Sequence, residues 1–190
     1  MKVQPLEIDE CFLIDHQVFL DERGYFREWF KSKDIAEIGD IFDVAQANLS
    51  FSRKNVIRGM HYSLSPFGQS KLITCISGKI LDVIIDLRTD SPTFMMQEQI
   101  ELTGETGYCI KIPSGVAHGF LSQSENSVVS YLLTSAYDPE TEKSLNPFDR
   151  TLQIDWGKWN SEAFILSERD LSAMSFDEAK KYSLLPRIIK

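Results

Sequence analysis

The stretch Lys79-Ile-Leu-Asp-Val-Ile-Ile-Asp-Leu87 decides the fold. Successive side chains of a β-strand point to opposite sides, so this stretch has two distinct faces when it is extended. One face is purely apolar and consists of Leu81, Val83, Ile85 and Leu87. We expect that face to pack in the core between two sheets. The other face mixes carboxylates with isoleucine, as the lining of a partly hydrated cavity does, and consists of Ile80, Asp82, Ile84 and Asp86.

Similar short segments lie on both sides of this strand along the chain. They are rich in Val, Ile, Tyr and Phe, and they span residues 55–63, 71–77, 94–102, 108–112, 117–122 and 127–134. Turn residues such as Gly, Pro, Asn and Ser separate them. A spacing of about 8–12 residues between strands is typical of a β-sandwich or barrel and not of alternating strand–helix units.

Helical patterns are confined to the two ends of the chain. The segment from Ser32 to Gly39 begins with a capping residue and stops at a glycine, which predicts a short helix. Ser175-Phe-Asp-Glu178 is a capping box that opens a second short helix before Pro186. We therefore expect one all-β domain over residues 1–190, with short peripheral helices near both ends.

Composition narrows the functional classes. The 190 residues include 43% hydrophobic side chains, enough for one proper core. The 28 acidic residues outnumber the 20 basic ones, and the net charge of -8 disfavours nucleic-acid partners and attachment to anionic membranes. No apolar run approaches the length of a membrane span. An acidic N-terminus and three cysteines without a CxxC pair lead us to expect a cytoplasmic protein.

Two of the three histidines, His61 and His118, lie in predicted strands. One strand histidine is more often a packed core residue than a catalyst, and two in the same sandwich narrow those odds. Gly107, Pro113, Gly115 and His118 have the spacing of the second motif of the cupin superfamily. Metal-binding cupins carry a His-x-His pair and a glutamate in their first motif, whereas this chain has His61-Tyr-Ser63 there. A divalent metal needs three or more ligands, so we expect neither a metal nor another cofactor.

A longer series of motifs closely resembles one family of the cupin superfamily. In chain order the motifs are Asp21-Glu-Arg-Gly-Tyr-Phe26, Gln46-Ala-Asn-Leu-Ser50, Val56-Ile-Arg-Gly-Met-His-Tyr62, Gln69-Ser-Lys-Leu72, Gly78-Lys-Ile-Leu-Asp-Val-Ile-Ile-Asp-Leu-Arg88, Ser91-Pro-Thr-Phe94, Ile112-Pro-Ser-Gly-Val-Ala-His-Gly-Phe120 and Leu166-Ser-Glu-Arg-Asp170. The resemblance is to the dTDP-4-dehydrorhamnose 3,5-epimerases and to relatives that epimerise other nucleotide-linked 4-keto sugars. It implies a metal-free, usually dimeric cupin-type jelly roll (a double-stranded β-helix sandwich) that inverts carbon centres next to a ketone.

Inversion beside a ketone needs a base, a group that stabilises the enolate, and a proton donor on the opposite face. The resemblance implies His61 as the base and Asp170 as the acid that orients its ring. It matches Lys71 to the lysine that faces the oxyanion and Tyr131 to the donor on the other side. Each has a simpler alternative: Asp170 as a helix-entry acid after Ser167, Lys71 as a surface lysine, and Tyr131 as a packing residue.

The resemblance also implies a substrate-binding set, in which some residues come from the neighbouring subunit. The set consists of Arg23, Phe26, Glu28, Gln46, Asn48, Arg58, Gln69, Asp82 and His118. Arg23 and Arg58 would hold the diphosphate through charge-assisted hydrogen bonds. His118 and Asp82 would complete a polar network behind the base.

Two features of the pattern need a structural answer. Arg58 and His61 are three residues apart and face opposite sides of a regular strand, so both serve one site only if Gly59 introduces a bulge or the site spans the strand. The family usually has a pair of tyrosines before its Pro-x-x-Glu turn, whereas this chain has Ala136 and Tyr137.

The resemblance, together with these residues, implies an epimerase that inverts C3, C5 or both of a nucleotide-linked 4-keto-6-deoxyhexose. The default reaction converts dTDP-4-dehydro-6-deoxyglucose to dTDP-4-dehydrorhamnose. The alternatives are a cupin-type 3,4-ketoisomerase on a similar nucleotide sugar and a non-catalytic nucleotide-sugar binding protein. Open sheet edges and ligand-type residues before Phe30 favour a homodimer that shares its N-terminal strands.

Overall fold

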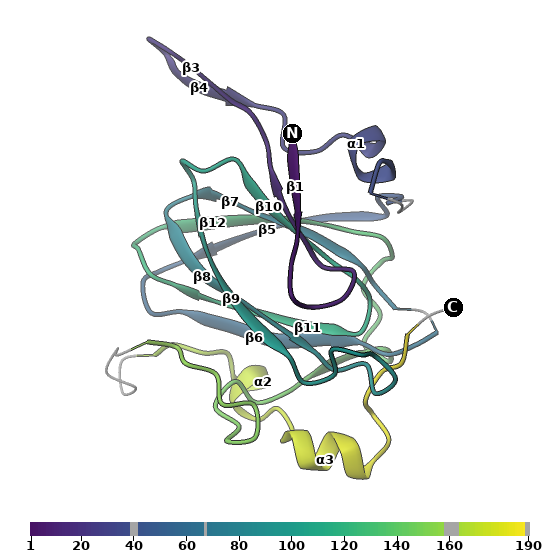
Figure 1. The fold of residues 1–190 in the computed structure, drawn as a ribbon. Helices are drawn as coiled ribbons and strands as arrows, with labels where there is room; N and C mark the ends of the chain where they lie inside the picture. The colour runs from purple at the N-terminus through teal and green to yellow at the C-terminus, as the bar shows by residue number, and fades with distance from the viewer. Residues whose placement is uncertain (39–41, 67, 158–163, 189–190) are drawn as a thin grey trace.

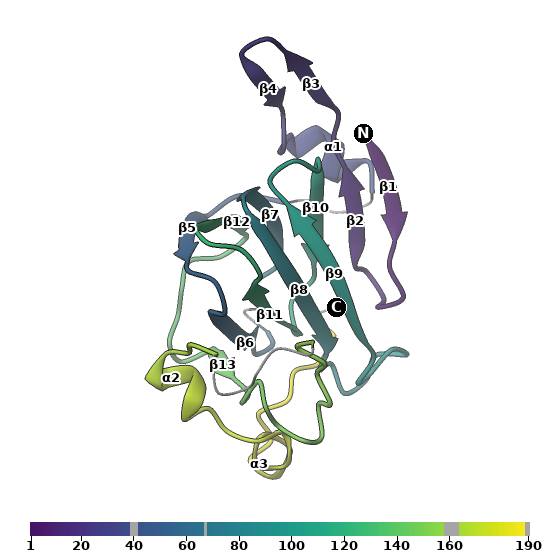
Figure 2. The ribbon, with the colours of Figure 1, turned by 90° about the vertical axis from the view of Figure 1, so that its left-hand side faces the viewer.

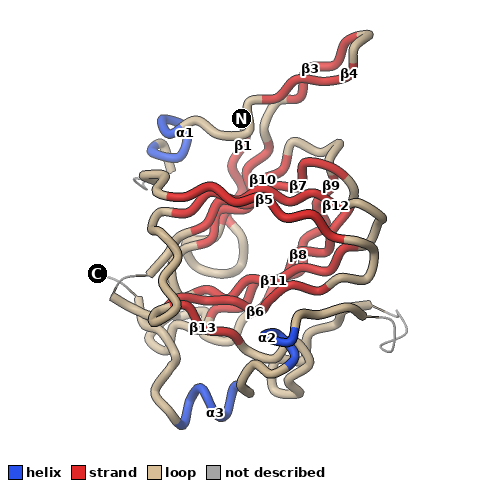
Figure 3. The backbone as a smooth tube through the Cα atoms, turned by 180° about the vertical axis from the view of Figure 1, so that it is seen from behind, coloured by secondary structure: helices blue, strands red, loops and turns tan. Residues whose placement is uncertain are grey.

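The computed structural model describes residues 1–38, 42–66, 68–157 and 164–188. Two antiparallel sheets face each other and form the expected all-β jelly roll (Figures 1 and 3). The six-stranded sheet has, in spatial order, β1 (Lys2–Pro5), β2 (Phe12–Asp15), β10 (Tyr108–Ile112), β7 (Lys71–Ser77), β12 (Ser127–Leu133) and β5 (Gln46–Ser52). The five-stranded sheet has β13 (Glu142–Ser144), β6 (Ile57–Ser63), β11 (Val116–Ser122), β8 (Lys79–Asp86) and β9 (Gln97–Thr103).

All seven strands predicted in the middle of the chain are present. The bounds of β7 and β10 agree with the prediction, and most of the others differ by one or two residues at an end. The start of β9 differs most, because Met95 has a positive φ of 67° and its N–H bonds to the carbonyl of Asp86. That turn delays the strand until Gln97. The strands β1 and β2, which extend one edge of the six-stranded sheet, were not predicted.

The apolar side chains pack in three layers. The middle layer fills the space between the sheets and includes Ile73, Ile80, Ile84 and Ile110. A second layer covers the outer face of the five-stranded sheet, where Leu145, Leu152, Trp156 and Phe176 of the C-terminal segment pack on β6, β8 and β11. A third covers the outer face of the six-stranded sheet, with Trp29, Phe30, Ile35 and Phe42 packed on β2, β7, β10 and β12.

The prediction for the two faces of β8 was wrong. The purely apolar face, Leu81, Val83, Ile85 and Leu87, does not lie between the sheets but packs against the C-terminal segment. Ile80 and Ile84, on the mixed face, point toward the six-stranded sheet. Alternation reveals that a strand has two faces, but both faces of β8 are covered, so alternation alone does not say which covering element is the second sheet.

The predicted short helices are present near both ends. The helix α1 (Ser32–Ala36) begins one residue earlier than we expected, because Lys31 and not Ser32 holds the N-cap position, and Lys31 makes no side-chain capping bond. Its expected end at Gly39 falls outside the described residues. The capping box at Ser175 and Glu178 opens α3 (Phe176–Lys181) as predicted. A further helix, α2 (Glu168–Leu171), lies beneath the five-stranded sheet (Figure 1).

One element stands apart from the two sheets. The strands β3 (Val18–Asp21) and β4 (Gly24–Arg27) pair only with each other and form a hairpin that projects from the body (Figures 1 and 2). Its exposed side chains include Phe19, Leu20 and Phe26.

Among the helices of the described residues, none combines the length and the apolar character that crossing a bilayer requires. Cys11, Cys75 and Cys109 are free and buried.

Candidate active site

A pocket of about 340 Å³ opens between the two sheets where β5 and β6 approach each other. The six-stranded sheet contributes side chains from β5, β7 and β12, and the five-stranded sheet contributes side chains from β6, β11 and β13. The mouth is completed by the segment after β12 and by α2. The lining residues are Gln46, Asn48, Arg58, His61, Gln69, Lys71, His118, Phe120, Tyr131, Leu133, Tyr137, Glu142, Ser167, Arg169 and Asp170.

His61 and Asp170 form a hydrogen-bonded pair in this pocket. The His61 Nε2 lies 2.7 Å from Oδ1 of Asp170, although the two residues are 109 positions apart. The Ser167 hydroxyl caps α2 by accepting the N–H of Asp170, which holds the carboxyl beneath β6. Burial by itself raises the pKa of Asp170, but bonds from His61, Ser167 and the Gly59 N–H hold that pKa below its usual value. Asp170 is therefore both the predicted partner of His61 and a helix-entry acid.

A second imidazole–carboxylate pair lies beside the first. His118 on β11 is the direct neighbour of His61 on β6, and its Nε2 lies 2.7 Å from Oδ2 of Asp82. Asp82 comes from β8 and is completely buried, so it supports the pocket through His118 and does not line it. The other oxygen, Oδ1, has no hydrogen-bond partner among the described residues. The predicted polar network behind His61 is thus present as a geometric arrangement.

Lys71 and Tyr131 lie on the wall opposite to His61. They belong to the adjacent strands β7 and β12, where Lys71 is the neighbour of Leu133 and Tyr131 that of Ile73. Lys71 is only 7% exposed, so the alternative of a surface lysine is wrong. Burial lowers the pKa of Lys71, and its Nζ makes one long hydrogen bond of 3.5 Å to the carbonyl of His61. An ammonium here is therefore easily deprotonated and poorly solvated.

A bulge in β6 brings Arg58 and His61 to the same pocket. Opposite β11, His61 pairs with His118 and Arg58 pairs with Phe120, so three steps along β6 match two along β11. Gly59 has a φ of 121°, and a Cβ atom there would lie 2.5 Å from the Gly119 Cα. The extra residue turns Arg58 back toward the pocket. Of the two expected arrangements, a bulge at Gly59 or a site that spans the strand, the structure has the bulge. Arg58 is oriented by the Ser52 hydroxyl and the Phe51 carbonyl.

The predicted amides line the pocket near its mouth. Gln46 and Asn48 project from β5 and are joined by a 2.9 Å hydrogen bond from the Gln46 Nε2. The other Gln46 atom, Oε1, accepts the N–H of Tyr137 at 2.8 Å. Gln69 donates to the carbonyl of Ser135 at 2.8 Å. These bonds tie the segment before Pro139 to the six-stranded sheet and present Tyr137 to the pocket.

Besides Asp82, three further predicted residues do not line the pocket of this chain. Arg23 at the tip of the hairpin and Phe26 on β4 are exposed, and Glu28 follows the hairpin. Arg23 pairs with Asp21 and Glu28 pairs with Lys31. These side chains are absent from the pocket lining because the hairpin projects away from the two sheets (Figure 1).

Six lining residues were not predicted: Phe120, Leu133, Tyr137, Glu142, Ser167 and Arg169. Arg169 Nη2 and Glu142 Oε1 form an ion pair of 2.8 Å at the mouth. Tyr137 and Glu142 stand at the positions of the second tyrosine and the glutamate of the turn motif, which was the available signal. Arg169 precedes the predicted Asp170, but nothing in the local sequence indicates that its side chain returns to the pocket.

The described residues hold no cluster of three or more His, Cys, Asp and Glu side chains that could bind a metal ion. The pocket instead combines an imidazole with a carboxylate partner on one wall and a lysine and a phenol on the other. Such a set can remove a proton from one face of a small ligand and supply one to the opposite face.

Comparisons with known proteins agree with this chemistry. A model of the family described as dTDP-4-dehydrorhamnose 3,5-epimerase matches residues 5–178. The chain is 37% identical over 188 residues to the dTDP-4-dehydrorhamnose 3,5-epimerase of Mycobacterium tuberculosis, covering 98% of this chain and 93% of the relative. It is 37% identical over 187 residues to a dTDP-4-dehydrorhamnose 3-epimerase of Streptomyces niveus, covering 98% and 89%.

A solved structure is similar over almost the whole of both chains. It is the dTDP-6-deoxy-D-glucose-3,5-epimerase of Legionella pneumophila in complex with dTDP-4-keto-L-rhamnose, with a TM-score of 0.89 and 36% identity, covering 100% of this chain and 99% of that chain. The agreement extends to the sequence motifs, the fold and the family model. The chain therefore belongs to the dTDP-4-dehydrorhamnose 3,5-epimerase family, whose members are isomerases.

Proposed function

We propose that this protein inverts C3, C5 or both of dTDP-4-dehydro-6-deoxyglucose by removing a proton beside the ketone and returning one to the opposite face. The observation that carries the proposal is the pairing of His61 with Asp170 on one wall, facing the sheet that bears Lys71 and Tyr131. Pure binding of a nucleotide sugar needs none of these four groups in this arrangement.

In the proposed reaction His61 accepts the proton from carbon. Asp170 bonds to Nε2 of His61, which leaves Nδ1 as the atom that receives the proton, and the neighbouring carboxylate stabilises the imidazolium that forms. Lys71 offers its ammonium to the oxygen that becomes the enolate, since a fixed positive charge in a buried site stabilises negative charge that develops there. Tyr131 donates from the opposite sheet, and its phenol needs no charge to do so.

The diphosphate of the substrate would bind at Arg58. Its guanidinium is held by Ser52 and the Phe51 carbonyl, and it forms no ion pair with any described carboxylate. An arginine in that state is suited to bidentate bonds with phosphate oxygens. Gln46, Asn48 and Gln69 would then contact the nucleotide or the sugar.

We also propose a homodimer in which the hairpin of one copy completes the pocket of the other. The hairpin exposes Phe19, Leu20 and Phe26, and the outer face of the edge strand β5 exposes Leu49 at 68% and Phe51 at 55%. Apolar surface of this kind beside an unpaired strand edge favours association. A partner hairpin on β5 would carry Arg23, Phe26 and Glu28 toward the pocket.

The test is incubation with dTDP-4-keto-6-deoxyglucose in heavy water, followed by NMR of the sugar. Deuterium at C3, C5 or both together with the epimeric product supports the proposal and reports how many centres are inverted. Some relatives are named 3,5-epimerases and others 3-epimerases, so this readout matters.

Two outcomes would overturn the proposal. A ketone moved to C3 without exchange at C5 would identify the 3,4-ketoisomerase alternative, and binding without any exchange would identify a binding protein. The same reaction after exhaustive treatment with EDTA tests the expectation that no metal takes part, which requires an unchanged rate.

The three free, buried cysteines support a reducing compartment such as the cytoplasm.

A further inference from the structure

The ionisable side chains in and behind the pocket are unevenly paired. Three carboxylates are each bonded to a different basic group: Asp170 to His61, Asp82 to His118 and Glu142 to Arg169. Among the described residues, Lys71 forms no ion pair with any of these acids. Lys71 is nevertheless the most deeply buried of the pocket cations, and its Nζ makes only the long bond to the carbonyl of His61. The ammonium that the proposed function assigns to Lys71 therefore depends on charges that do not contact it directly.

Charged groups face Lys71 from three surrounding elements. Glu142 on β13 and Asp82 on β8 favour the ammonium, and Arg169 on α2 opposes it. His61 of β6 and Tyr131 of β12 line the same pocket. Glu142 lines the same pocket as Lys71, whereas Asp82 lies behind His118 and does not line it, so Glu142 is the acid placed to act on Lys71 within the pocket.

The position of Glu142 is fixed by backbone pairing. The strand β13 pairs with β6 so that Glu142 lies opposite Ser63, two residues beyond His61. The Glu142 side chain is 17% exposed, whereas the Arg169 side chain is 47% exposed. Arg169 therefore lies on the solvent side of Glu142. The negative charge of Glu142 acts both on Arg169 and on the groups of the pocket.

We propose that Glu142 is a positioning residue that keeps Lys71 in its ammonium form, and that Arg169, by holding Glu142, limits this effect. The effect of Glu142 on the charge of Lys71 does not depend on the proposed function. Only the use of that charge to stabilise an enolate oxygen rests on the proposed function. Without Glu142, burial would favour the neutral amine, and an amine cannot supply the positive charge that an enolate oxygen requires.

The experiment measures the titration of Lys71 directly, by NMR of protein labelled in its lysine side chains, with Lys71→Gln used to assign the signal. Glu142→Gln should lower the pKa of Lys71, and Arg169→Gln should raise it. Each shift should be of the order of one pH unit, the size that neighbouring charges commonly produce. Glu142→Asp keeps the charge and should restore most of the normal titration.

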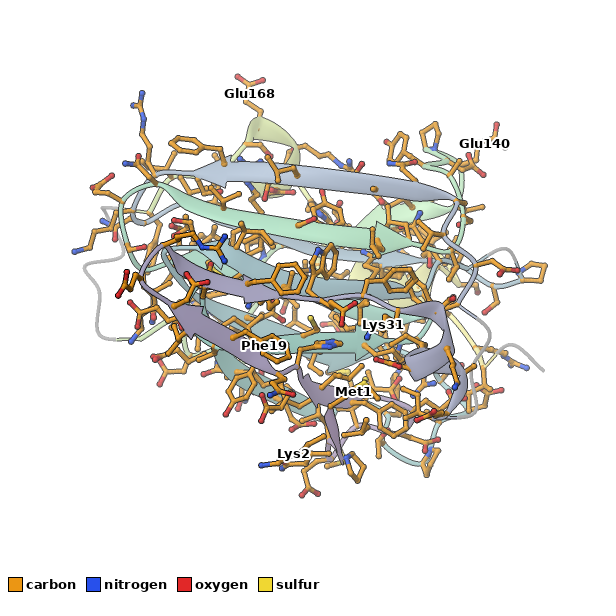
Figure 4. The ribbon with its side chains drawn as sticks, turned by 90° about the horizontal axis from the view of Figure 1, so that it is seen from above. Met1, Lys2, Phe19, Lys31, Glu140 and Glu168 are labelled. Atoms are coloured by element: carbon orange, nitrogen blue, oxygen red, sulfur yellow. The ribbon has the colours of Figure 1, made fainter. Side chains whose placement is uncertain are left out.

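Two exposed acids provide matched controls. Glu140 lies two residues before Glu142, and Glu168 is next to Arg169, and both side chains point away from the body (Figure 4). Glu140→Gln and Glu168→Gln remove the same charge as Glu142→Gln and should leave the titration of Lys71 unchanged. Circular dichroism of every variant shows whether the fold is retained.

The two expected shifts in the pKa of Lys71 have opposite directions, which separates this role from a purely structural one. An ion pair that only braces the mouth would give the same result whether Glu142 or Arg169 is removed, and such agreement would overturn the proposal. An unchanged titration in Glu142→Gln would also overturn it. Should Glu142→Gln fail to fold, Arg169→Gln and Glu142→Asp still provide the test. If Lys71→Gln keeps full epimerase activity, the role of Lys71 in the proposed function fails, while the titration result stands independently.

Discussion

At the scale of single residues, His61 depends on Asp170 for the orientation of its ring. In the proposed mechanism the bond to Nε2 leaves the other nitrogen for the substrate, and the lowered pKa of Asp170 keeps this partner negatively charged at neutral pH. An imidazole that is held in one orientation avoids the loss of rate that a freely rotating ring would bring. The two side chains are best regarded as one functional unit.

Replacement of the base tests this unit. His61→Asn should fold normally and lose activity by about 10²–10⁴-fold, because an amide does not accept a proton from carbon. The measurement is the initial rate of epimer formation, with thermal unfolding as the check on folding. Turnover close to that of the wild type would remove His61 from the mechanism.

Asp170 offers a prediction about pH. Its pKa is lowered in the folded state, so its charged form contributes stability above the ordinary carboxyl pKa, and this contribution is lost as the pH falls through the lowered value. Asp170→Asn should therefore melt at a lower temperature than the wild type at pH 7, and the difference should shrink toward pH 3. A difference that is constant across this range would contradict the assignment.

Tyr131 tests the second half of the reaction. A proton that returns from His61 regenerates the starting configuration, so inversion needs a donor on the other wall. Tyr131→Phe keeps the ring and removes only the hydroxyl. Solvent exchange into the substrate should continue while inversion falls by about 10²–10⁴-fold. Deuterium uptake and epimer formation are followed in one sample, and equal loss of both would show that Tyr131 is not the donor.

At the scale of elements, the bulge in β6 is the feature on which the pocket depends. It turns Arg58 inward and directs the Gly59 N–H to Asp170. Only glycine suits this position, because the φ is positive and a Cβ atom would meet the Gly119 Cα and the His118 carbonyl.

Gly59→Ala should therefore destabilise the protein by about 2–5 kcal/mol through backbone strain and overpacking. Gly24→Ala is the matched control, since Gly24 also has a positive φ, of 127°, but has no atom within 4 Å of its missing Cβ. Its cost should be confined to the backbone strain. Urea unfolding of both variants measures the difference, and equal costs would mean that the contact with β11 does not matter.

The elements also explain what the sequence could predict. The strands β7 and β10 were predicted with correct bounds, because their apolar runs end at clear turn residues. The strand β5 was recognised only as a motif, because its polar residues Gln46 and Asn48 face the pocket while Leu49 and Phe51 face outward. That inverts the usual pattern of apolar residues inside. The same inversion identifies β5 as a pocket-lining strand once the fold is known.

Contacts between residues that are far apart in the sequence limit how much of the site can be predicted. His61, Lys71, Tyr131 and Asp170 were predicted through a family resemblance and meet in one pocket. Arg169 and its pairing with Glu142 depend on where α2 docks, which no local pattern encodes. The positions of Arg23, Phe26 and Glu28 depend in turn on the direction of the hairpin.

At the scale of the whole molecule, the projecting hairpin predicts that two damaged copies can repair each other. In the proposed dimer, His61→Asn spoils a pocket but leaves its hairpin intact, and Arg23→Ala does the reverse. A mixed dimer then contains one intact pocket completed by one intact hairpin. Equal amounts of the two variants, unfolded and refolded together, should reach about a quarter of the wild-type rate, since half of the dimers are mixed and each carries one intact site.

Two controls make this experiment decisive. Each variant refolded alone should stay near its own low rate, and light scattering should report a dimer. If the mixture shows only the average of the two single variants, the hairpin does not serve a neighbouring pocket. A monomer with full activity would also exclude the shared site.

The docking of α2 has a consequence for the order in which the enzyme is made. All strands of both sheets lie before Leu145, whereas Asp170 and the helices that cover the outer face of the five-stranded sheet come later. A growing polypeptide emerging from the ribosome therefore presents every sandwich strand, together with Lys71 and Tyr131, before His61 has gained its carboxylate partner. In the proposed mechanism activity begins only when translation has passed Asp170, so we expect a prematurely terminated product to be a catalytically silent sandwich with one uncovered apolar face.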